Sequence, residues 1–206
     1  MKGKFITFEG GDGAGKTTLI ESVYKTLVSQ GKDVLKTREP GGSPVGAEIR
    51  NLILHSQAPL TKKCELFLFL ADRAEHVDKI ILPALEKGQI VLCDRFNDST
   101  IAYQSGARGL DEQTVRSLCT IAASGLEPDL TLYLDLDPRI AFERVKKIGK
   151  HKDQIEAEDL TFHDKIRKTF HEIGKREPRR FFLIDARQPA ESVLLTSLKL
   201  LNQINI

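Results

Sequence analysis

A glycine-rich stretch near the start of the chain carries the residue types best suited to phosphate chemistry. Residues 10–17, GGDGAGKT, fit the pattern G-x-x-x-x-G-K-[ST]. In such loops backbone N–H groups point at phosphate oxygens, the lysine reaches the β- and γ-phosphates, and the final hydroxyl ligates Mg²⁺. A chance glycine turn is the alternative, but an apolar run precedes this stretch and a helical pattern follows it. We therefore expect a nucleoside triphosphate to bind Gly10, Gly11, Asp12, Gly13, Ala14, Gly15, Lys16 and Thr17.

A second set of charged residues follows the apolar run 90–93. Asp94 and Arg95 stand where this predicted strand ends, and ligands of open α/β sheets bind outside the carboxyl ends of the strands. An acid there suits Mg²⁺, and an arginine can bridge two phosphate groups. A surface ion pair between neighbours is the alternative. Asp135 also ends an apolar run and competes with Asp94 for the metal.

Three further patterns each allow a functional and a plain structural interpretation. Arg38 lies between a predicted strand and a glycine turn, as a phosphate clamp or as a solvated loop residue. Phe69 and Arg73 lie four residues apart on a predicted helix, so they either hold a flat ring or combine core packing with a surface charge. A basic run either closes over a polyphosphate or forms a solvated helix face; it comprises Arg144, Lys146, Lys147, Lys150 and Lys152.

The elements that must position these side chains alternate along the chain. Apolar runs without polar alternation occur at 5–8, 34–35, 90–93, 130–136 and 181–184, and helical patterns separate them. Buried strands separated by helices predict an α/β fold with a parallel sheet covered on both faces. The segment 61–87 predicts a long helix with two apolar faces, of which the second serves a dimer or the core. No linker divides the chain, so we expect one domain over 1–206 with an exposed, mobile segment at about 144–158.

The composition narrows the class of protein. The chain has 206 residues, 29% of them charged, and a net charge of +2, so no basic surface for nucleic acid is expected. There is no apolar run of a signal peptide or of a membrane span, which indicates a cytoplasmic protein without a membrane partner. Cys64, Cys93 and Cys119 lie in apolar stretches, and we expect all three to be reduced core residues. The Asn-Lys-x-Asp motif of small GTPases is absent.

Three motifs in the same order resemble those of thymidylate kinases of the bacterial type. They are TREPGG at 37–42, FLFLADR at 67–73 and LCDRFNDSTIAYQ at 92–104. The resemblance extends from about Gly3 to Pro189. It implies the three-layer P-loop kinase fold with a mainly parallel five-stranded sheet and a small mobile lid at about 144–158. It also implies a phosphotransferase that uses ATP and Mg²⁺ to convert dTMP to dTDP in dTTP synthesis, and a homodimer.

The resemblance assigns roles to the residues singled out above. Lys16, Asp94 and Arg95 would act in catalysis, Thr17, Glu9 and Asp94 at the metal, and Arg144 at the adenine. Arg73 would donate to thymine O4, which a cytosine amino group cannot replace. Asp12, an unexpected acid inside a phosphate loop, would accept the 3′-hydroxyl of the acceptor sugar. The expected dTMP site comprises Asp12, Arg38, Phe69, Arg73, Arg95, Ser99, Thr100, Tyr103 and Gln104, where Tyr103 would also disfavour a 2′-hydroxyl.

The chain departs from the family at one place. Members without an arginine inside the phosphate loop usually supply one from the lid, and here the loop position is Gly13. The Asp-Arg-Ile-Glu of the bacterial lid appears as DQIE at 153–156. We expect lid lysines to supply the charge, with Lys150 as the catalytic candidate beside Lys147 and Lys152, although lysine lacks the arginine fork. The alternatives are a kinase for another small acceptor and an ATP-dependent switch without an acceptor.

Overall fold

The computed structural model describes residues 3–148 and 158–206. Its centre is a five-stranded sheet in the order β2-β3-β1-β4-β5, and all neighbouring strands are parallel. The strands are β1 (Lys4–Glu9), β2 (Val34–Arg38), β3 (Ile90–Asp94), β4 (Leu130–Asp135) and β5 (Phe181–Asp185). Each of the five predicted apolar runs forms one strand, which confirms the predicted α/β fold.

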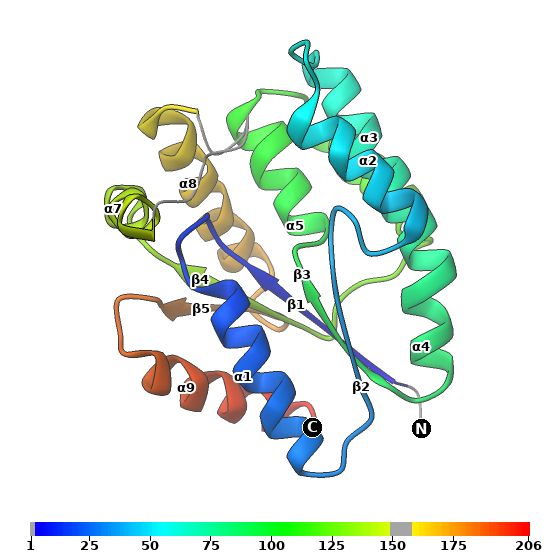
Figure 1. The fold of residues 1–206 in the computed structure, drawn as a ribbon, viewed down its shortest axis with the longest axis vertical. Coiled ribbons are helices and arrows are strands. Elements are labelled where there is room, and N and C mark those ends of the chain that lie inside the picture. Colours follow the sequence, from blue (N-terminus) through cyan, green and yellow to red (C-terminus); the bar gives the residue numbers. More distant parts are fainter. Residues whose placement is uncertain (1–2, 149–157) are drawn as a thin grey trace.

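Helices cover both faces of the sheet (Figure 1). α1 (Lys16–Ser29) and α9 (Ala190–Gln203) pack on one face, where Ile6, Leu92 and Leu132 are buried. The other face, with Phe5, Val91 and Tyr133, is covered by helices from the middle and late parts of the chain. Those helices are α3 (Lys62–His76), α4 (Leu82–Glu86), α5 (Asn97–Thr100), α6 (Glu112–Ala122) and α8 (Leu160–Arg176).

Two shorter segments join this arrangement near the site. α2 (Pro44–His55) packs on α3, and α7 (Pro138–Ile148) precedes the undescribed residues 149–157. Ser43 caps α2 by accepting a hydrogen bond from the backbone N–H of Gly46, and proline occupies the first position of the helix. The lid proposed for about 144–158 therefore lies largely outside the described residues.

The predicted helix 61–87 is continuous but not uniform. α3 passes into a π-helical segment, η1 (Val77–Ile81), and then into α4. Pro83 explains the change, because it has no N–H to donate and its ring crowds the preceding turn. A second π-helical segment, η2 (Ile101–Ala107), follows α5 directly. η2 begins inside the sequence motif at 92–104, which contributes to the cleft described below.

One expectation about α3 is wrong, and one alternative that the sequence left open is decided. Cys64 is exposed, although Cys93 and Cys119 are buried as predicted. The second apolar face, which includes Leu66 and Leu70, belongs to the core, whereas Phe67 on the other face is 57% exposed. The sequence shows that α3 has two apolar faces, but which face is covered depends on where the neighbouring helices pack. No helix within 3–148 or 158–206 has the length and apolar character of a membrane span.

Candidate active site

Most of the predicted site residues line one cleft at the carboxyl ends of β1, β2 and β3. Parallel strands bring these ends to one edge of the sheet, so segments far apart in the sequence meet there. The predicted residues that line the cleft are Asp12, Gly13, Gly15, Lys16, Thr17, Arg38, Phe69, Arg73, Asp94, Arg95, Ser99, Thr100, Tyr103 and Gln104. Glu9, Gly10, Gly11, Ala14 and Arg144 do not line it.

The phosphate loop, residues 10–15, leads from β1 into α1 with the backbone that the glycines permit. Gly10, Gly13 and Gly15 all have positive φ, at 145°, 79° and 100°. The Lys16 ammonium donates to the carbonyl oxygens of Gly10 at 2.9 Å and Gly11 at 3.1 Å. Burial and the nearby Arg95 lower the pKa of Lys16. The loop therefore presents backbone N–H groups and a buried cation that incoming phosphates can compete for.

Gly13 has steric as well as conformational reasons to be glycine. A Cβ there would lie 2.7 Å from the carbonyl oxygen of Ala141 and 3.0 Å from Cγ2 of Val145, both on α7. An arginine at this loop position therefore requires α7 to move. This packing is consistent with the expectation that a segment other than the phosphate loop supplies the additional catalytic charge.

Asp94 has the character of a metal ligand that its position in sequence indicates. It is half-buried at the end of β3, and its Oδ1 has no hydrogen-bond partner among the described residues. Thr17, the hydroxyl residue of the phosphate loop, lines the same cleft. A buried carboxylate oxygen without a donor suits a divalent cation, so this pair fits Mg²⁺.

Glu9 and Asp135, the other predicted metal candidates, are occupied elsewhere. Glu9 is fully buried, and it accepts hydrogen bonds from the Phe96 backbone N–H at 2.8 Å and the Ser99 hydroxyl at 2.5 Å. Asp135 accepts from Arg167 at 2.7 and 3.0 Å. The geometry therefore does not support the predicted metal role of Glu9. Its carboxyl group instead holds the start of α5 in place.

The acid inside the phosphate loop faces an arginine. Asp12 Oδ1 accepts a hydrogen bond from Nη2 of Arg95 at 2.9 Å. The same guanidinium lies 3.3 Å from the Ser99 hydroxyl and 3.2 Å from the Tyr103 hydroxyl. Arg95 adopts a φ of 70°, which is unusual outside glycine and which aims its side chain from the end of β3 across the cleft. Asp12 thus offsets a cation whose position between the loop and η2 suits an acceptor phosphate.

A buried arginine and a half-buried aromatic ring form the far wall of the cleft. Arg73 is 2% exposed, donates to Glu39 through Nε at 2.9 Å, and donates through NH1 to Thr100 Oγ1 at 2.9 Å. Phe69, one helical turn earlier, lines the cleft beside it. Gln104 donates to Glu65 at 3.1 Å. The predicted Phe69 and Arg73 pair is therefore part of the cleft rather than an ordinary core and surface pair.

Comparisons with known proteins identify the family of the chain. The thymidylate kinase family model matches residues 8–195. The chain belongs to the thymidylate kinase family. It is 49% identical to the thymidylate kinase of Desulfovibrio desulfuricans, over 93% of this chain and 91% of that protein. It is 42% identical to that of Protochlamydia amoebophila, over 98% and 94%. The crystal structure of Ehrlichia chaffeensis thymidylate kinase aligns with a TM-score of 0.80 at 34% identity, over 98% of this chain and 99% of that one.

The predicted residues of this thymidylate kinase family member that lie outside the cleft are placed as follows. Arg144 borders a separate groove between α1 and α9, together with Gly15 and Gln188, and donates to the carbonyl oxygen of Ala186 at 3.1 Å. This groove adjoins the phosphate loop, where an adenine would extend from the phosphates. Lys147 is exposed near the end of α7. Lys150 and Lys152, together with 153–156, lie outside the described residues.

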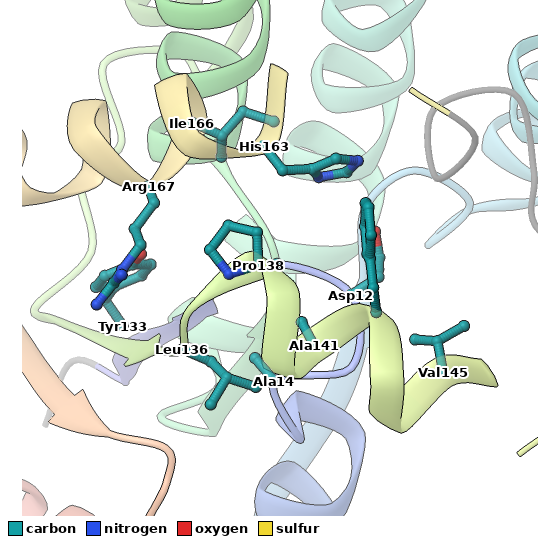
Figure 2. A pocket seen from close by; sticks show the side chains of 12 residues that line it. Asp12, Ala14, Tyr133, Leu136, Pro138, Ala141, Val145, His163, Ile166 and Arg167 are labelled. Carbon is teal, nitrogen blue, oxygen red and sulfur yellow. The ribbon is translucent and has the colours of Figure 1, made fainter. Parts of the chain in front are cut away.

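A second cavity adjoins the phosphate loop in this thymidylate kinase family member. Figure 2 shows it between α7 and α8, with Ala14 and Asp12 of the loop at its border. Its lining is mainly apolar, and its Arg167 is paired with Asp135. Five cationic side chains from separate segments line the main cleft, namely Lys16, Arg38, Arg50, Arg73 and Arg95, whereas within the described residues Arg167 is the one lysine or arginine that lines the second cavity. The main cleft is therefore the candidate active site.

Sequence reasoning did not identify Glu39 and His76, the buried residues behind Arg73. Glu39 lies inside the motif at 37–42 and His76 lies one turn after Arg73, yet neither was assigned a role. Their signal in the sequence is weak, since a glutamate in a loop and a histidine on a helix are ordinary features. Their burial, at 4% and 0% exposure, is what distinguishes them.

Proposed function

We propose that this protein transfers the γ-phosphoryl group of ATP to dTMP, forming ADP and dTDP, which is a step in dTTP synthesis. The observation that carries this proposal is the single cleft shared by the phosphate loop and the Phe69 and Arg73 wall. A triphosphate on the loop and a nucleoside monophosphate against the wall would direct their phosphates toward Arg95. Phosphoryl transfer depends on such positioning and on charge stabilisation.

The acceptor phosphate would bind between two arginines. Arg95 extends from the end of β3 and Arg38 from the end of β2, and both line the cleft. Arginine forks contact two oxygens at once, so the pair would orient the phosphate for in-line attack. Asp12 would exchange its bond to Arg95 for one to the 3′-hydroxyl of the sugar when the phosphate binds. Lys16 would stabilise the charge that develops on the transferred group.

Thr17 and Asp94 would hold Mg²⁺. Bound there, the ion neutralises charge on the β- and γ-phosphates. The unpartnered Oδ1 of Asp94 supports this assignment. Glu9 would contribute indirectly by fixing the segment that contains Phe96 and Ser99.

The base would stack on Phe69 and meet Arg73 at its edge. The contacts of Arg73 to Glu39, Thr100 and the Cys119 sulfur use four of its five N–H groups, so one N–H remains for thymine O4. Cytosine carries an amino donor at that position and would leave a buried N–H without a partner. Ser99, Thr100, Tyr103 and Gln104 complete the pocket, and Tyr103 would crowd a 2′-hydroxyl.

Three further assignments belong to this proposal. Lys150, with Lys147 and Lys152, would supply the lid charge that Gly13 does not, and Arg144 would contact the adenine. The protein would act in the cytoplasm. It would form a homodimer through the apolar side chains that stay exposed on α2 and α3, namely Val45, Leu52 and Phe67, which are 49%, 54% and 57% exposed.

An acceptor panel tests the proposed reaction. ADP formation would be measured with ATP, Mg²⁺ and each of dTMP, dUMP, dCMP, dGMP and dAMP. We expect the highest kcat/KM for dTMP. A preference for a purine would assign the cleft to a different monophosphate. Slow ATP hydrolysis that dTMP leaves unchanged would indicate a nucleotide-dependent switch and overturn the proposal.

A further inference from the structure

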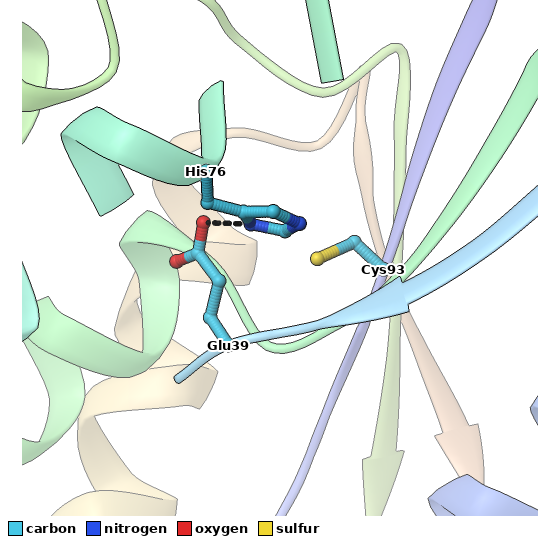
Figure 3. A group of neighbouring side chains, drawn as sticks. All are labelled: Glu39, His76 and Cys93. Atoms are coloured by element: carbon cyan, nitrogen blue, oxygen red, sulfur yellow. Dashed lines mark hydrogen bonds and ion pairs between the residues drawn. The ribbon is translucent and has the colours of Figure 1, made fainter. Parts of the chain in front are cut away.

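A buried cluster of three chemically active side chains lies behind the base wall. Glu39, His76 and Cys93 come from the end of β2, from α3 and from β3 (Figure 3). Their potential ligand atoms all lie within 4.8 Å of one another, and within the described residues no other group of His, Cys, Asp and Glu side chains meets that criterion. The cluster has the composition of a metal site, yet it is next to Arg73.

The hydrogen bonds of the cluster argue against a metal. His76 is engaged on both ring nitrogens, by Glu39 Oε1 at 2.9 Å and by Thr37 Oγ1 at 2.6 Å. Burial raises the pKa of the Cys93 thiol, which stays protonated and donates to the carbonyl oxygen of Arg95 at 3.2 Å. A metal needs a thiolate and a free ring nitrogen, and it would be repelled by the Arg73 guanidinium.

The contacts instead form a chain that ends on Arg73. An ionised Glu39 can only accept hydrogen bonds, so Nδ1 of His76 carries a proton and donates to it. When the ring is neutral, Nε2 then accepts from the Thr37 hydroxyl. The other oxygen of Glu39 accepts from Nε of Arg73 at 2.9 Å and from NH2 at 2.8 Å. Thr37, His76 and Glu39 thus fix the plane of the guanidinium from behind.

We infer that His76 and Glu39 are positioning residues that set the discrimination between an oxygen and an amino group at position 4 of the pyrimidine. This inference rests on the proposed function, because it takes Arg73 as the donor to O4. Arg73 can reject an amino group only if its remaining N–H group keeps its direction. Residues 0–4% exposed, joined by charge-assisted bonds, provide that rigidity.

The loop that follows β2 also connects the wall formed by Phe69 and Arg73 to Arg38, which would bind the acceptor phosphate. Glu39 follows Arg38 directly, and the loop after it is fixed to α3 by the Asp72 carboxylate, which accepts from the Gly41 N–H at 2.8 Å. Arg50 donates to the carbonyl oxygen of Pro40 at 2.9 Å. A shift of His76 is therefore expected to reach the acceptor phosphate as well as the base, whereas the ATP site on the other side of the cleft is not connected to this loop by these bonds.

Two substitutions separate positioning from simple packing. His76→Leu removes the donor to Glu39 and leaves its Oε1 buried without a partner. His76→Asn keeps an N–H near the position of Nδ1 and loses the link to Thr37. Leucine has about the volume of histidine and asparagine is smaller, so a role in packing alone predicts the larger effect for His76→Asn. Thr37→Val removes one hydroxyl from the far end of the series of hydrogen bonds that leads to Arg73. This variant provides the test if the histidine variants fold poorly.

The readout is the ratio of kcat/KM for dTMP to that for 5-methyl-dCMP, two nucleotides that differ at position 4 and at the adjoining ring nitrogen. We expect His76→Leu to lower this ratio about tenfold and to raise KM for dTMP while KM for ATP stays constant. His76→Asn should retain most of the ratio, and Thr37→Val should lower it by a smaller factor. The ratio of dTMP to dUMP, which differ only in the methyl group, should not change.

Two reference variants complete the experiment. Arg73→Gln gives the ratio without the guanidinium. His171→Leu is the matched control, because His171 also contacts a carboxylate, Asp135, that binds an arginine of the same helix. It should leave the ratio intact. The inference fails if Arg73→Gln abolishes discrimination but His76→Leu, His76→Asn and Thr37→Val all retain it. Failure of the wild type to phosphorylate dTMP would instead refute the proposed function.

Discussion

Replacement of Glu9 by glutamine isolates the energetic effect of a carboxyl group buried beneath the active site. Burial, and then the negative charge of Asp98, raise the pKa of Glu9 from 4.5 to about 8, against the opposing effects of Ser99, Arg95 and Phe96. The group is therefore protonated in the folded protein at neutral pH and ionised in the unfolded chain. Glutamine keeps its shape, and its amide can still accept from the Phe96 N–H and contact Ser99.

The size and sign of the effect follow from proton linkage. Between pH 4.5 and pH 8 the unfolded state binds fewer protons than the native state, so the free energy of unfolding falls as pH rises. The shift of the pKa from 4.5 to about 8 destabilises the folded state by about 5 kcal/mol once Glu9 is fully ionised, and by about 3 kcal/mol at pH 7. This contribution disappears below pH 4.5. The glutamine side chain does not titrate, so Glu9→Gln does not lose this stability as pH rises.

Urea unfolding of both proteins at pH 5, 7 and 8.5, without nucleotide or metal, measures the difference. We expect the stability of Glu9→Gln relative to that of the wild type to increase by about 4 kcal/mol between pH 5 and pH 8.5. Because the other titrating groups are common to both proteins, their contributions cancel in the comparison. An equal stability difference at all three pH values would mean that the Glu9 carboxyl group ionises normally, and would refute the argument from burial.

Further predictions concern the loops around the cleft. Asp12→Asn should raise KM for dTMP about tenfold or more and change KM for ATP much less, because Asp12 pairs with Arg95 and, in the proposed function, would accept from the acceptor sugar; equal changes would assign the carboxylate to the metal or to the loop structure. Gly42→Ala should lower stability by about 1–3 kcal/mol and weaken dTMP binding, because a Cβ there would lie 2.2 Å from His76 Nε2 and 2.6 Å from the Arg38 carbonyl oxygen; thermal unfolding and dTMP titration measure both, and wild-type values for the two would contradict the packing. Single alanine substitutions of Lys147, Lys150 and Lys152 should reduce kcat if lid lysines supply the charge. Unchanged kcat in all three variants would exclude these lysines as its source.

Much of the fold was accessible from the sequence because its signals are local. The five strands are continuous apolar runs, and Gly31 ends α1 where the helical pattern stops. The phosphate loop depends on glycines that adopt positive φ, so its sequence fixes its conformation. The motifs at 37–42 and 92–104 identify the family, and the parallel sheet then brings their residues to one edge.

The sequence could not assign the partners of the charged side chains. Glu9, Asp94 and Asp135 all stand at strand ends, yet only Asp94 keeps a carboxylate oxygen without a hydrogen-bond partner among the described residues. Glu9 is turned to Phe96 and Ser99, and Asp135 to Arg167 and His171. Which acid meets a cation, an N–H group or a metal depends on the packing of distant helices.

The exposure of α3 and the network behind Arg73 were also decided by the tertiary structure. Helical periodicity shows that α3 is apolar on two sides, but only the packing of α2 and α6 leaves Phe67 exposed and Leu70 buried. The sequence by itself determined the phosphate loop, the order of strands and helices, and the family. Tertiary structure decided that Glu39 meets Arg73 and His76 across 34 and 37 residues of chain, because hydrogen bonds between distant segments leave no periodic signal in the sequence.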